Sequence, residues 1–516
     1  MGDPFYITTA ISYPNGRPHI GHAYEAIAAD AIARFQRQAG RGVLFQTGTD
    51  EHGLKMVQAA RAQDRDVADY AAEMSGYFRQ MCDTLQISYD RFIRTTEPEH
   101  HRASQALWEK MEKNGDLYLD RYEGWYSVRD EAFYDEKELI DGEGGAKLSP
   151  QGTPVDWTAE ETWFFRLSKY QQPLLDLYAS NPDFIRPDSR RNEVVRFVEG
   201  GLNDLSVSRT SFDWGVPVPG SPGHVMYVWV DALTNYLTGT GFPDQTADAR
   251  FWPAELHLIG KDIVRFHAVY WPAFLLSASV PLPKSVFGHG FLLSRGEKMS
   301  KSIGNVVDPI ALANAFGTDA LRYFLLREVS FGQDGSYSPE AIVTRVNAEL
   351  ANAFGNLAQR TLSFIAKNLD GTLPDRGRVD PADAMLIEEV VVACAALKAG
   401  FADLMLSHGI EAWLRGVYAC NQYIDVQAPW ALRKTDPDRM NAVLATLIRA
   451  IRMLAIAISP VVPDGAGRIL DQLGAIERDH AAVDDDGWYD RQAAAGARLA
   501  TPAPAFPRLE LPAEAA

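Results

Sequence analysis

Two short segments of the chain carry side chains that could bind phosphate. The segment "HIGH" places His19 and His22 on either side of an isoleucine and a glycine, and "KMSKS" places Lys298 and Lys301 three residues apart among hydroxyl groups. Imidazole and backbone N–H groups can donate to phosphate oxygens, and lysines can neutralise their charge. The alternatives are a tight turn with two surface histidines and a solvated basic turn.

These residues must be positioned by α/β elements. "FYITTAIS" is rich in β-branched and aromatic residues, which predicts a strand. A helix that ends near Gly40 is predicted by apolar residues at four-residue spacing, at Ala23, Ile27, Ala31 and Phe35. The histidines then lie on the loop before this helix. "GVLFQTGTDEHG" predicts a second, buried strand, and Asp50 follows it at a carboxyl strand end, where open parallel sheets bind ligands.

Composition narrows the class of protein. A chain of 516 residues with 46% hydrophobic residues can bury a sizeable core, divided into roughly three to four units. No apolar run reaches about 20 residues and the first residues lack a signal-peptide pattern, so we expect a cytoplasmic protein without a membrane span. Three scattered cysteines fit a reducing compartment. A net charge of −18 excludes a global attraction for nucleic acid, so any such contact must be local.

The composition and hydrophobic pattern of the sequence change twice along the chain. From about Asp116 to Gly223 it is aromatic, acidic and turn-rich, which predicts an inserted domain; α/β alternation then resumes. After Asn352 long apolar periodic stretches predict a helix bundle. The last residues, "TPAPAFPRLELPAEAA", are rich in proline and alanine and are expected to pack loosely or as a strap.

"HIGH" and "KMSKS", in this order and on strand-end loops, are the signature pair of class I aminoacyl-tRNA synthetases. With "TGTDEHG", "YVWVDALTNY", "IGKDIVRFHAVYWPA" and "NLAQR" the chain resembles bacterial methionyl-tRNA synthetases over most of residues 5–435. The resemblance implies an α/β fold: a Rossmann-type catalytic domain, split by a connective insertion, and an α-helical anticodon-binding bundle. The expected domains are a first catalytic half, the insertion, a second catalytic half, a stem-contact segment, the anticodon domain and a tail, at 1–115, 116–223, 224–305, 306–350, 351–490 and 491–516.

The resemblance also implies an activity. ATP would activate L-methionine to methionyl-adenylate, and methionine would then pass to the terminal adenosine of tRNA(Met), initiator tRNA included. His19, His22, Lys298 and Lys301 would be the catalytic residues, and Mg²⁺ would accompany ATP. Some relatives carry an appended domain that dimerises, and this chain ends too early to contain one, so a monomer is expected.

Family correspondence assigns further residues to three sites. ATP would contact Gly21, Glu25, Gly260, Asp262, Gly290, Phe291, Met299 and Ser300. Methionine would contact Ala10, Ile11, Tyr13, Asp50, Trp229, Ala232, Leu233, Tyr236, Ile263, Phe266 and His267. The tRNA anticodon would contact Asn356, Arg360 and Trp430.

Simpler explanations compete with several of these roles. Glu25 could be a first-turn helix carboxylate, and Trp229, Tyr236, Phe266 and Trp430 could be core residues. In the methionine pocket, a leucine at position 233 stands where some relatives have proline.

The insertion departs from many members of the family. Their knuckle binds zinc through cysteines, but no Cys or His occurs between His101 and His224. Carboxylates such as Asp135, Glu136 and Asp141 could not replace four thiolates. We therefore expect no structural zinc and a knuckle, "GWYSVRDEAFYDEKELIDG", held by aromatic packing.

Two rival functions remain. Synthetases for leucine, isoleucine, valine or cysteine share both signatures. The first three usually carry a large editing insertion, which this chain is too short to hold. The cysteine enzyme has a zinc-thiolate design, which is absent from this sequence. A non-catalytic tRNA-binding paralogue would not need His19, His22, Lys298 and Lys301 intact.

Overall fold

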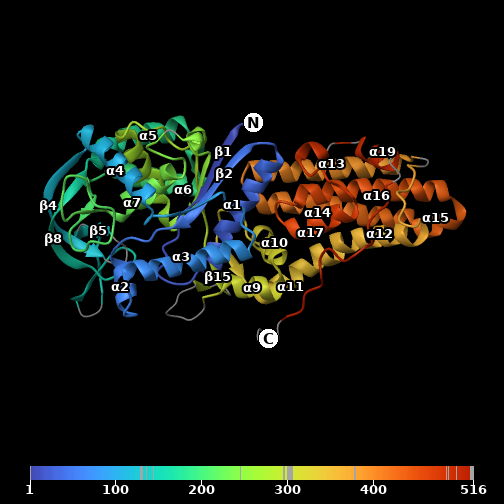
Figure 1. Cartoon of the computed structure of the whole chain (residues 1–516), viewed down its shortest axis with the longest axis horizontal. Coiled ribbons are helices and arrows are strands. Elements are labelled where there is room, and N and C mark those ends of the chain that lie inside the picture. The colour runs from blue at the N-terminus through green and yellow to red at the C-terminus, as the bar shows by residue number, and fades with distance from the viewer. Residues whose placement is uncertain are drawn as a thin grey trace.

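The computed structural model has an elongated shape, with α/β elements at one end and a helix bundle at the other (Figure 1). It describes residues 2–127, 132–134, 136–142, 145–244, 246–294, 297–298, 306–376, 379–483, 485, 487–494 and 497–511.

A six-stranded parallel sheet forms the centre of the α/β end. Its strand order is β3-β2-β1-β13-β14-β9. The strands are β1 (Pro4–Thr9), β2 (Gly42–Thr49), β3 (Arg91–Arg94), β9 (Ile185–Arg186), β13 (Leu256–Gly260) and β14 (Val286–His289). From β1 the chain adds β2 and then β3 on one side of the sheet. The later strands β13 and β14 are added on the other side of β1. The crevice at the carboxyl ends of β1 and β13 is therefore a topological switch point, where doubly wound sheets bind ligands.

The first three elements confirm the strand–helix–strand prediction. Helix α1 (Ile20–Gln38) connects β1 to β2 and buries the apolar residues at four-residue spacing, Ala23, Ile27, Ala31 and Phe35. Further helices around the sheet are α2 (Leu54–Arg61), α3 (Val67–Thr84), α4 (Pro98–Lys113), α7 (Val228–Thr238) and α8 (Trp271–Ser277).

A second, antiparallel sheet lies in the predicted insertion. Its order is β10-β8-β4-β5, and it forms the end of the molecule farthest from the bundle (Figure 1). Its strands are β4 (Leu117–Ser127), β5 (Ala132–Tyr134), β8 (Asp156–Phe165) and β10 (Leu205–Ser206). Beside it lie a small hairpin, β6 (Ile140–Asp141) and β7 (Lys147–Leu148), and the pair β11 (Ser208–Arg209) and β12 (Val225–Met226). Helices α5 (Gln171–Ser180) and α6 (Asp188–Glu199) flank β9, which returns from the insertion to pair with β14.

The knuckle is held by aromatic rings and by a cluster of hydroxyl groups. Trp125 and Trp157 meet edge to face, with ring centroids 5.5 Å apart. Thr153 Oγ1 lies 2.7 Å from Ser127 Oγ and 2.8 Å from Ser149 Oγ, and all three side chains are buried. Aromatic packing was predicted from the sequence, whereas the hydroxyl cluster was not.

A small sheet and three helices join the two ends. The sheet consists of β15 (Leu292–Ser294), β16 (Glu297–Lys298) and β17 (Gly335–Tyr337). The helices are α9 (Pro309–Phe316), α10 (Thr318–Glu328) and α11 (Pro339–Val346), and a π-helical stretch, Asn347–Gly355, continues into α12 (Asn356–Asn368).

The predicted bundle follows. It comprises α12 with α13 (Pro381–Ala402), α14 (Leu406–Gln427), α15 (Pro429–Thr435), α16 (Pro437–Ile458), α17 (Pro463–Gln472), α18 (His480–Val483) and α19 (Gly487–Ala494). Among the described residues, one helix, α16, is long and apolar enough to cross a membrane by length and composition, and 89% of its apolar window is buried as the core of the bundle. The tail packs as a strap: Leu509 exchanges two hydrogen bonds with Asn347, and Phe506 is buried.

Candidate active site

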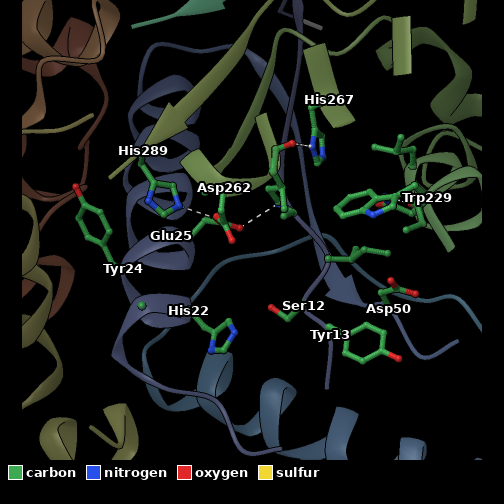
Figure 2. A pocket seen from close by; sticks show the side chains of 18 of the residues that line it. Ser12, Tyr13, His22, Tyr24, Glu25, Asp50, Trp229, Asp262, His267 and His289 are labelled. Atoms are coloured by element: carbon green, nitrogen blue, oxygen red, sulfur yellow. Dashed lines mark hydrogen bonds and ion pairs between the residues drawn. The ribbon is translucent and has the colours of Figure 1, made fainter. Parts of the chain in front are cut away.

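A pocket of about 500 Å³ opens at the switch point between β1 and β13. Glu25, His289 and Asp262 lie together on one side of it, and Trp229 and Asp50 on the other (Figure 2). The predicted residues that line it are His19, His22, Gly21, Glu25, Gly260, Asp262, Gly290, Phe291, Ala10, Ile11, Tyr13, Asp50, Trp229, Ala232, Leu233, Tyr236, Ile263 and His267. Residues from the ends of β1, β2, β13 and β14 and from several helices, α1 and α7 among them, thus meet in one cavity.

The two histidines of "HIGH" begin α1. His19 is the N-cap: its Nδ1 accepts the Gly21 N–H at 3.1 Å, and His22 Nδ1 accepts the backbone N–H of His19 at 3.1 Å. Because each Nδ1 is an acceptor, a neutral ring carries its hydrogen on Nε2. The backbone therefore makes Nε2 of both rings the donor, at the positive end of a helix dipole.

Glu25 is not a first-turn carboxylate, because α1 begins at Ile20. Its Oε1 accepts the Ala10 N–H at 3.0 Å, and its Oε2 lies 2.8 Å from His289 Nε2. Burial raises the pKa of Glu25, although His289 acts to lower it. Burial would lower the pKa of His289, but the hydrogen bond and charge of Glu25 outweigh burial and raise it. The pair therefore retains a shared proton and fixes the end of β1 against the end of β14.

Glycines at the ends of β13 and β14 allow close backbone packing at the pocket wall. A Cβ on Gly260 would lie 2.7 Å from Asp262 Oδ1, and one on Gly290 would lie 2.1 Å from the carbonyl oxygen of Gln333. The neighbouring Phe291 N–H donates to Asp334 Oδ1 at 2.8 Å. Because these glycines have no side chain, the pocket wall beside Glu25 is formed by backbone atoms of Gly260 and Gly290.

An aromatic wall faces this side from α7 and the segment after β13. The Trp229 and Phe266 rings stack with centroids 3.7 Å apart and planes 7° apart, so Phe266 supports Trp229 from behind although it does not line the pocket. Trp229 lines the cavity, which contradicts its interpretation as a simple core residue. Tyr236 is almost fully buried, yet it also lines the cavity.

Tyr236 and His267 form a hydrogen-bonded pair in this wall. His267 Nδ1 lies 3.0 Å from the carbonyl oxygen of Ile263, which can only accept, so Nδ1 carries the hydrogen. Burial lowers the pKa of His267 to about 4, which keeps the ring neutral. Its Nε2 is then an acceptor, and the Tyr236 hydroxyl donates to it at 2.7 Å.

Asp50 is 7% exposed and lies directly after β2, as predicted. Its backbone N–H donates to the Ser12 carbonyl at 2.9 Å, which joins the ends of β1 and β2. Tyr13 is fixed beside it, because its hydroxyl accepts the Met56 N–H at 3.0 Å. A carboxylate at this depth is suited to a cationic group of a ligand.

The "KMSKS" segment begins at the edge of the pocket. Leu292, the first residue of β15, lines the cavity, and β15 pairs with β16, which ends at Lys298. The predicted residues Met299, Ser300 and Lys301 lie outside the described residues, as does the side chain of Lys298.

The predicted anticodon residues lie together on the bundle. Asn356 is exposed at the start of α12, one helical turn before Arg360. The Arg360 guanidinium is 5.5 Å from the centre of the Trp430 ring and pairs with Asp425 at 2.8 Å. Trp430 is 47% exposed, so its alternative as a core residue is wrong.

The sequence did not single out several pocket residues: Ser12, Tyr24, Lys55, Val228, Asn235, His289 and Leu292. Tyr24, Val228, Asn235 and Leu292 adjoin predicted residues, and their exposure to the cavity depends on packing. His289 had a usable signal, because it lies within "GHGF", residues 288–291, a segment that the family resemblance places near the adenine. Lys55 follows "TDEHG" and lies over the Tyr13 ring, 5.3 Å from its centre.

Among the described residues, no group of three or more His, Cys, Asp or Glu side chains could hold a metal ion. The expectation of a zinc-free knuckle stays a prediction.

Comparisons with known proteins agree with this geometry. Residues 5–362 match the family described as tRNA synthetases class I (M), and residues 373–512 match the anticodon binding domain of methionyl tRNA ligase. The methionine–tRNA ligase of Mycobacterium tuberculosis (strain CDC 1551 / Oshkosh) is 55% identical over 99% of this chain and 98% of its own length; that of Brucella suis is 55% identical over 98% of each. The solved Mycobacterium tuberculosis methionyl-tRNA synthetase in complex with methionyl-adenylate superimposes with a TM-score of 0.94 at 54% identity, over 98% of this chain and 100% of its own.

The fold and pocket are those of a class I aminoacyl-tRNA synthetase. Within that class, the chain belongs to the methionyl-tRNA synthetase family.

Proposed function

We propose that this chain activates L-methionine with ATP to methionyl-adenylate and transfers methionine to the terminal adenosine of tRNA(Met), including initiator tRNA, for initiation and elongation of translation. The observation that carries the proposal is one pocket that joins the donor-rich start of α1 to a buried carboxylate and an aromatic wall. The relative solved with methionyl-adenylate has the same fold at 54% identity.

In the activation step the methionine carboxylate oxygen attacks the α-phosphorus of ATP. A new O–P bond forms, the bond to the β-phosphate oxygen breaks, and the electron pair leaves with pyrophosphate. Nε2–H donors of His19 and His22 face this charge at the start of α1, and Lys298 and Lys301 are proposed to neutralise the leaving group. Removal of one preorganised donor typically costs about 3–4 kcal/mol of transition-state stabilisation.

Nucleotide and amino acid occupy opposite sides of the pocket in this proposal. The adenosine lies against Gly21, Glu25 and Asp262, and beside the backbone of Gly260, Gly290 and Phe291, and Met299 and Ser300 are proposed to contact the nucleotide as well. Mg²⁺ enters with ATP and neutralises phosphate charge when it is bound. The described carboxylates of the pocket fit a cation held mainly by phosphate oxygens and water, as is usual for Mg²⁺ with nucleotides.

Methionine is selected by charge at one end and by polarizable contacts at the other. Asp50 binds the ammonium group. The thioether packs against Trp229, supported by Phe266, and sulfur–ring contacts favour it. The hydrogen bond from the Tyr236 hydroxyl to His267 Nε2 fixes both rings in the wall that contacts the side chain. The remaining wall consists of Ala10, Ile11, Tyr13, Ala232, Leu233 and Ile263.

The tRNA contacts are local. Trp430 stacks an anticodon base, and Asn356 and Arg360 read base edges, as is general for single-stranded RNA loops. We further propose that the protein works in the cytoplasm, as a monomer and without a membrane partner.

Exchange of labelled pyrophosphate into ATP, measured with each of the twenty amino acids, tests the activity. We expect methionine to support exchange at least about tenfold better than any other amino acid at equal concentration. Preference for leucine, isoleucine, valine or cysteine would indicate another synthetase, and exchange with none of them would indicate a non-catalytic paralogue.

A further inference from the structure

Three buried side chains form a connected network behind the pocket. His52 Nδ1 lies 2.6 Å from Asp231 Oδ2, and His100 Nε2 lies 2.7 Å from Asp231 Oδ1. The relative exposures are 3% for His52 and 0% for the other two. His100 Nδ1 is in turn 3.0 Å from Thr238 Oγ1, at the end of α7. The network thus joins the loop after β2, helix α4 and helix α7.

The carboxylate at its centre is ionised. Burial alone would raise the pKa of Asp231, but His52 and His100 lower it well below its ordinary value. Since an ionised carboxylate only accepts, both facing ring nitrogens carry hydrogens, and both contacts are charge-assisted. His101, whose ring centre is 5.4 Å from that of His52, is the next titratable neighbour; burial lowers its pKa.

His52 lies two residues after Asp50 on a loop that has other buried anchors. Glu51 accepts two hydrogen bonds from Arg94, at 2.7 and 2.9 Å, and its carbonyl accepts the Trp214 indole N–H at 2.6 Å. These contacts fix the loop to the neighbouring strand and to the insertion. The His52–Asp231 contact fixes the same loop to α7.

Asp231 does not itself line the pocket, although other residues of α7 do: Val228, Trp229, Ala232, Leu233, Asn235 and Tyr236. One carboxylate therefore links the loop that carries Asp50 to the helix that carries the aromatic wall, and both lie on the same side of the pocket (Figure 2).

We propose that His52, Asp231 and His100 are positioning residues that set the Asp50 carboxylate relative to α7 and thereby determine the affinity of the site for the ammonium group of its substrate. This inference rests on the proposed function, in which Asp50 binds that group.

The test compares two analogues of methionine, of which one keeps the ammonium group and loses the carboxylate, and the other keeps the carboxylate and loses the ammonium group. L-Methioninol keeps the ammonium, whereas 4-(methylsulfanyl)butanoate has the methionine skeleton without it; both are measured as inhibitors of methionine-dependent pyrophosphate exchange. Asp231→Asn is expected to weaken L-methioninol inhibition and raise the KM for methionine by about tenfold or more, with the butanoate constant and the KM for ATP within about twofold of wild type.

Two controls separate positioning from stability. Asp116 is another buried carboxylate, bound to Tyr170 and Ser277, and none of the three lines the pocket, so Asp116→Asn should leave both ligands unaffected even if it lowers the melting temperature. Asn at position 52 can present an amide N–H where His52 presents Nδ1–H, so His52→Asn should keep a near-normal KM for methionine while His52→Ala raises it.

Equal weakening of both ligands by Asp231→Asn, or equal behaviour of His52→Asn and His52→Ala, would overturn the positioning role. Failure of the proposed function would give a different result, because the wild-type protein would then show no methionine-dependent exchange at all.

Discussion

At the scale of single residues, the main chain decides what each pocket histidine can do. His19 and His22 meet backbone N–H groups through Nδ1 and so become Nε2 donors. His267 meets a carbonyl oxygen through Nδ1 and so becomes an Nε2 acceptor for Tyr236. The same side chain therefore serves opposite ends of the pocket in opposite tautomers.

The lowered pKa of His267 makes stability depend on pH. An unfolded histidine binds a proton below about pH 6.5, whereas folded His267 binds one only near pH 4, so the unfolded state binds more protons in this window. The contribution of His267 to the free energy of unfolding is therefore fully present above pH 6.5, and it is lost as the pH decreases toward 4. Wild type should lose about 2 kcal/mol more than His267→Gln between pH 7 and pH 5, as measured by urea unfolding.

The comparison must be made with the variant, because His257 is also buried with its pKa lowered well below the ordinary value and acts in the same direction. Parallel stability curves for wild type and His267→Gln would show that His267 titrates normally.

Some pocket residues could be located from sequence because a local pattern was sufficient. Asp50 follows a recognisable buried strand, and His19 precedes a recognisable helix. The role of Asp231 could not be found in this way, since its partners, His52 and His100, lie more than 100 residues away in the chain.

At the scale of elements, buried hydroxyl groups hold the knuckle together. Thr153 joins Ser127 and Ser149 through buried hydroxyl contacts between β4 and the turn before β8. Such hydrogen bonds contribute about 1 kcal/mol each, and their loss leaves buried groups unsatisfied.

We expect purified protein to contain far less than one zinc per chain and to keep its exchange activity after chelation in excess Mg²⁺. Elemental analysis and an exchange assay before and after treatment with chelator provide the measurement. About one equivalent of zinc, or activity that returns only with added zinc, would contradict the prediction.

The prediction of elements succeeded where periodicity is local. Helix α1 and strands β1 and β2 follow directly from their apolar patterns. Strand β9 could not be predicted, because two residues carry no pattern and it forms only through pairing with β14. The exposure of Trp430 was equally undetermined, since it depends on how α15 packs on α12 and α16.

At the scale of the whole molecule, a buried ion pair joins the catalytic end to the bundle. The guanidinium of Arg322, in α10, lies 2.6 Å from Asp30 of α1 and donates to the carbonyls of Pro460 and Val461, between α16 and α17. Both charged side chains are fully buried. The helix that begins with "HIGH" is therefore tied, through one residue, to the turn at the inner end of the bundle.

Replacement of Arg322 by methionine should lower the free energy of unfolding by about 3–5 kcal/mol, because Asp30 loses a buried partner. The exposed pair of Arg65 with Glu73 provides the control, and Arg65→Met should cost less than about 1 kcal/mol. Urea unfolding measures the loss in the free energy of unfolding for both variants. Equal losses in the two variants would show that the buried pair has no special role.

Trp430 tests the division of labour between the two ends. Figure 1 places α15 at the end of the bundle farthest from the catalytic sheet. Because the indole is 47% exposed, Trp430→Ala should change stability by less than about 1 kcal/mol and leave methionine-dependent exchange intact. The specificity constant for charging tRNA should fall about 5- to 150-fold, since loss of base stacking costs about 1–3 kcal/mol.

A matched buried tryptophan gives this prediction its contrast. Trp413 of α14 is fully buried and donates to the Leu454 carbonyl at 3.0 Å, so Trp413→Ala should cost about 3–5 kcal/mol of stability and reduce both reactions only as folded protein is lost. Thermal midpoint, exchange rate and charging rate are measured on both variants. Charging that stays normal in Trp430→Ala would remove the indole from anticodon recognition, because that variant keeps its fold and its active site and lacks only the stacking surface.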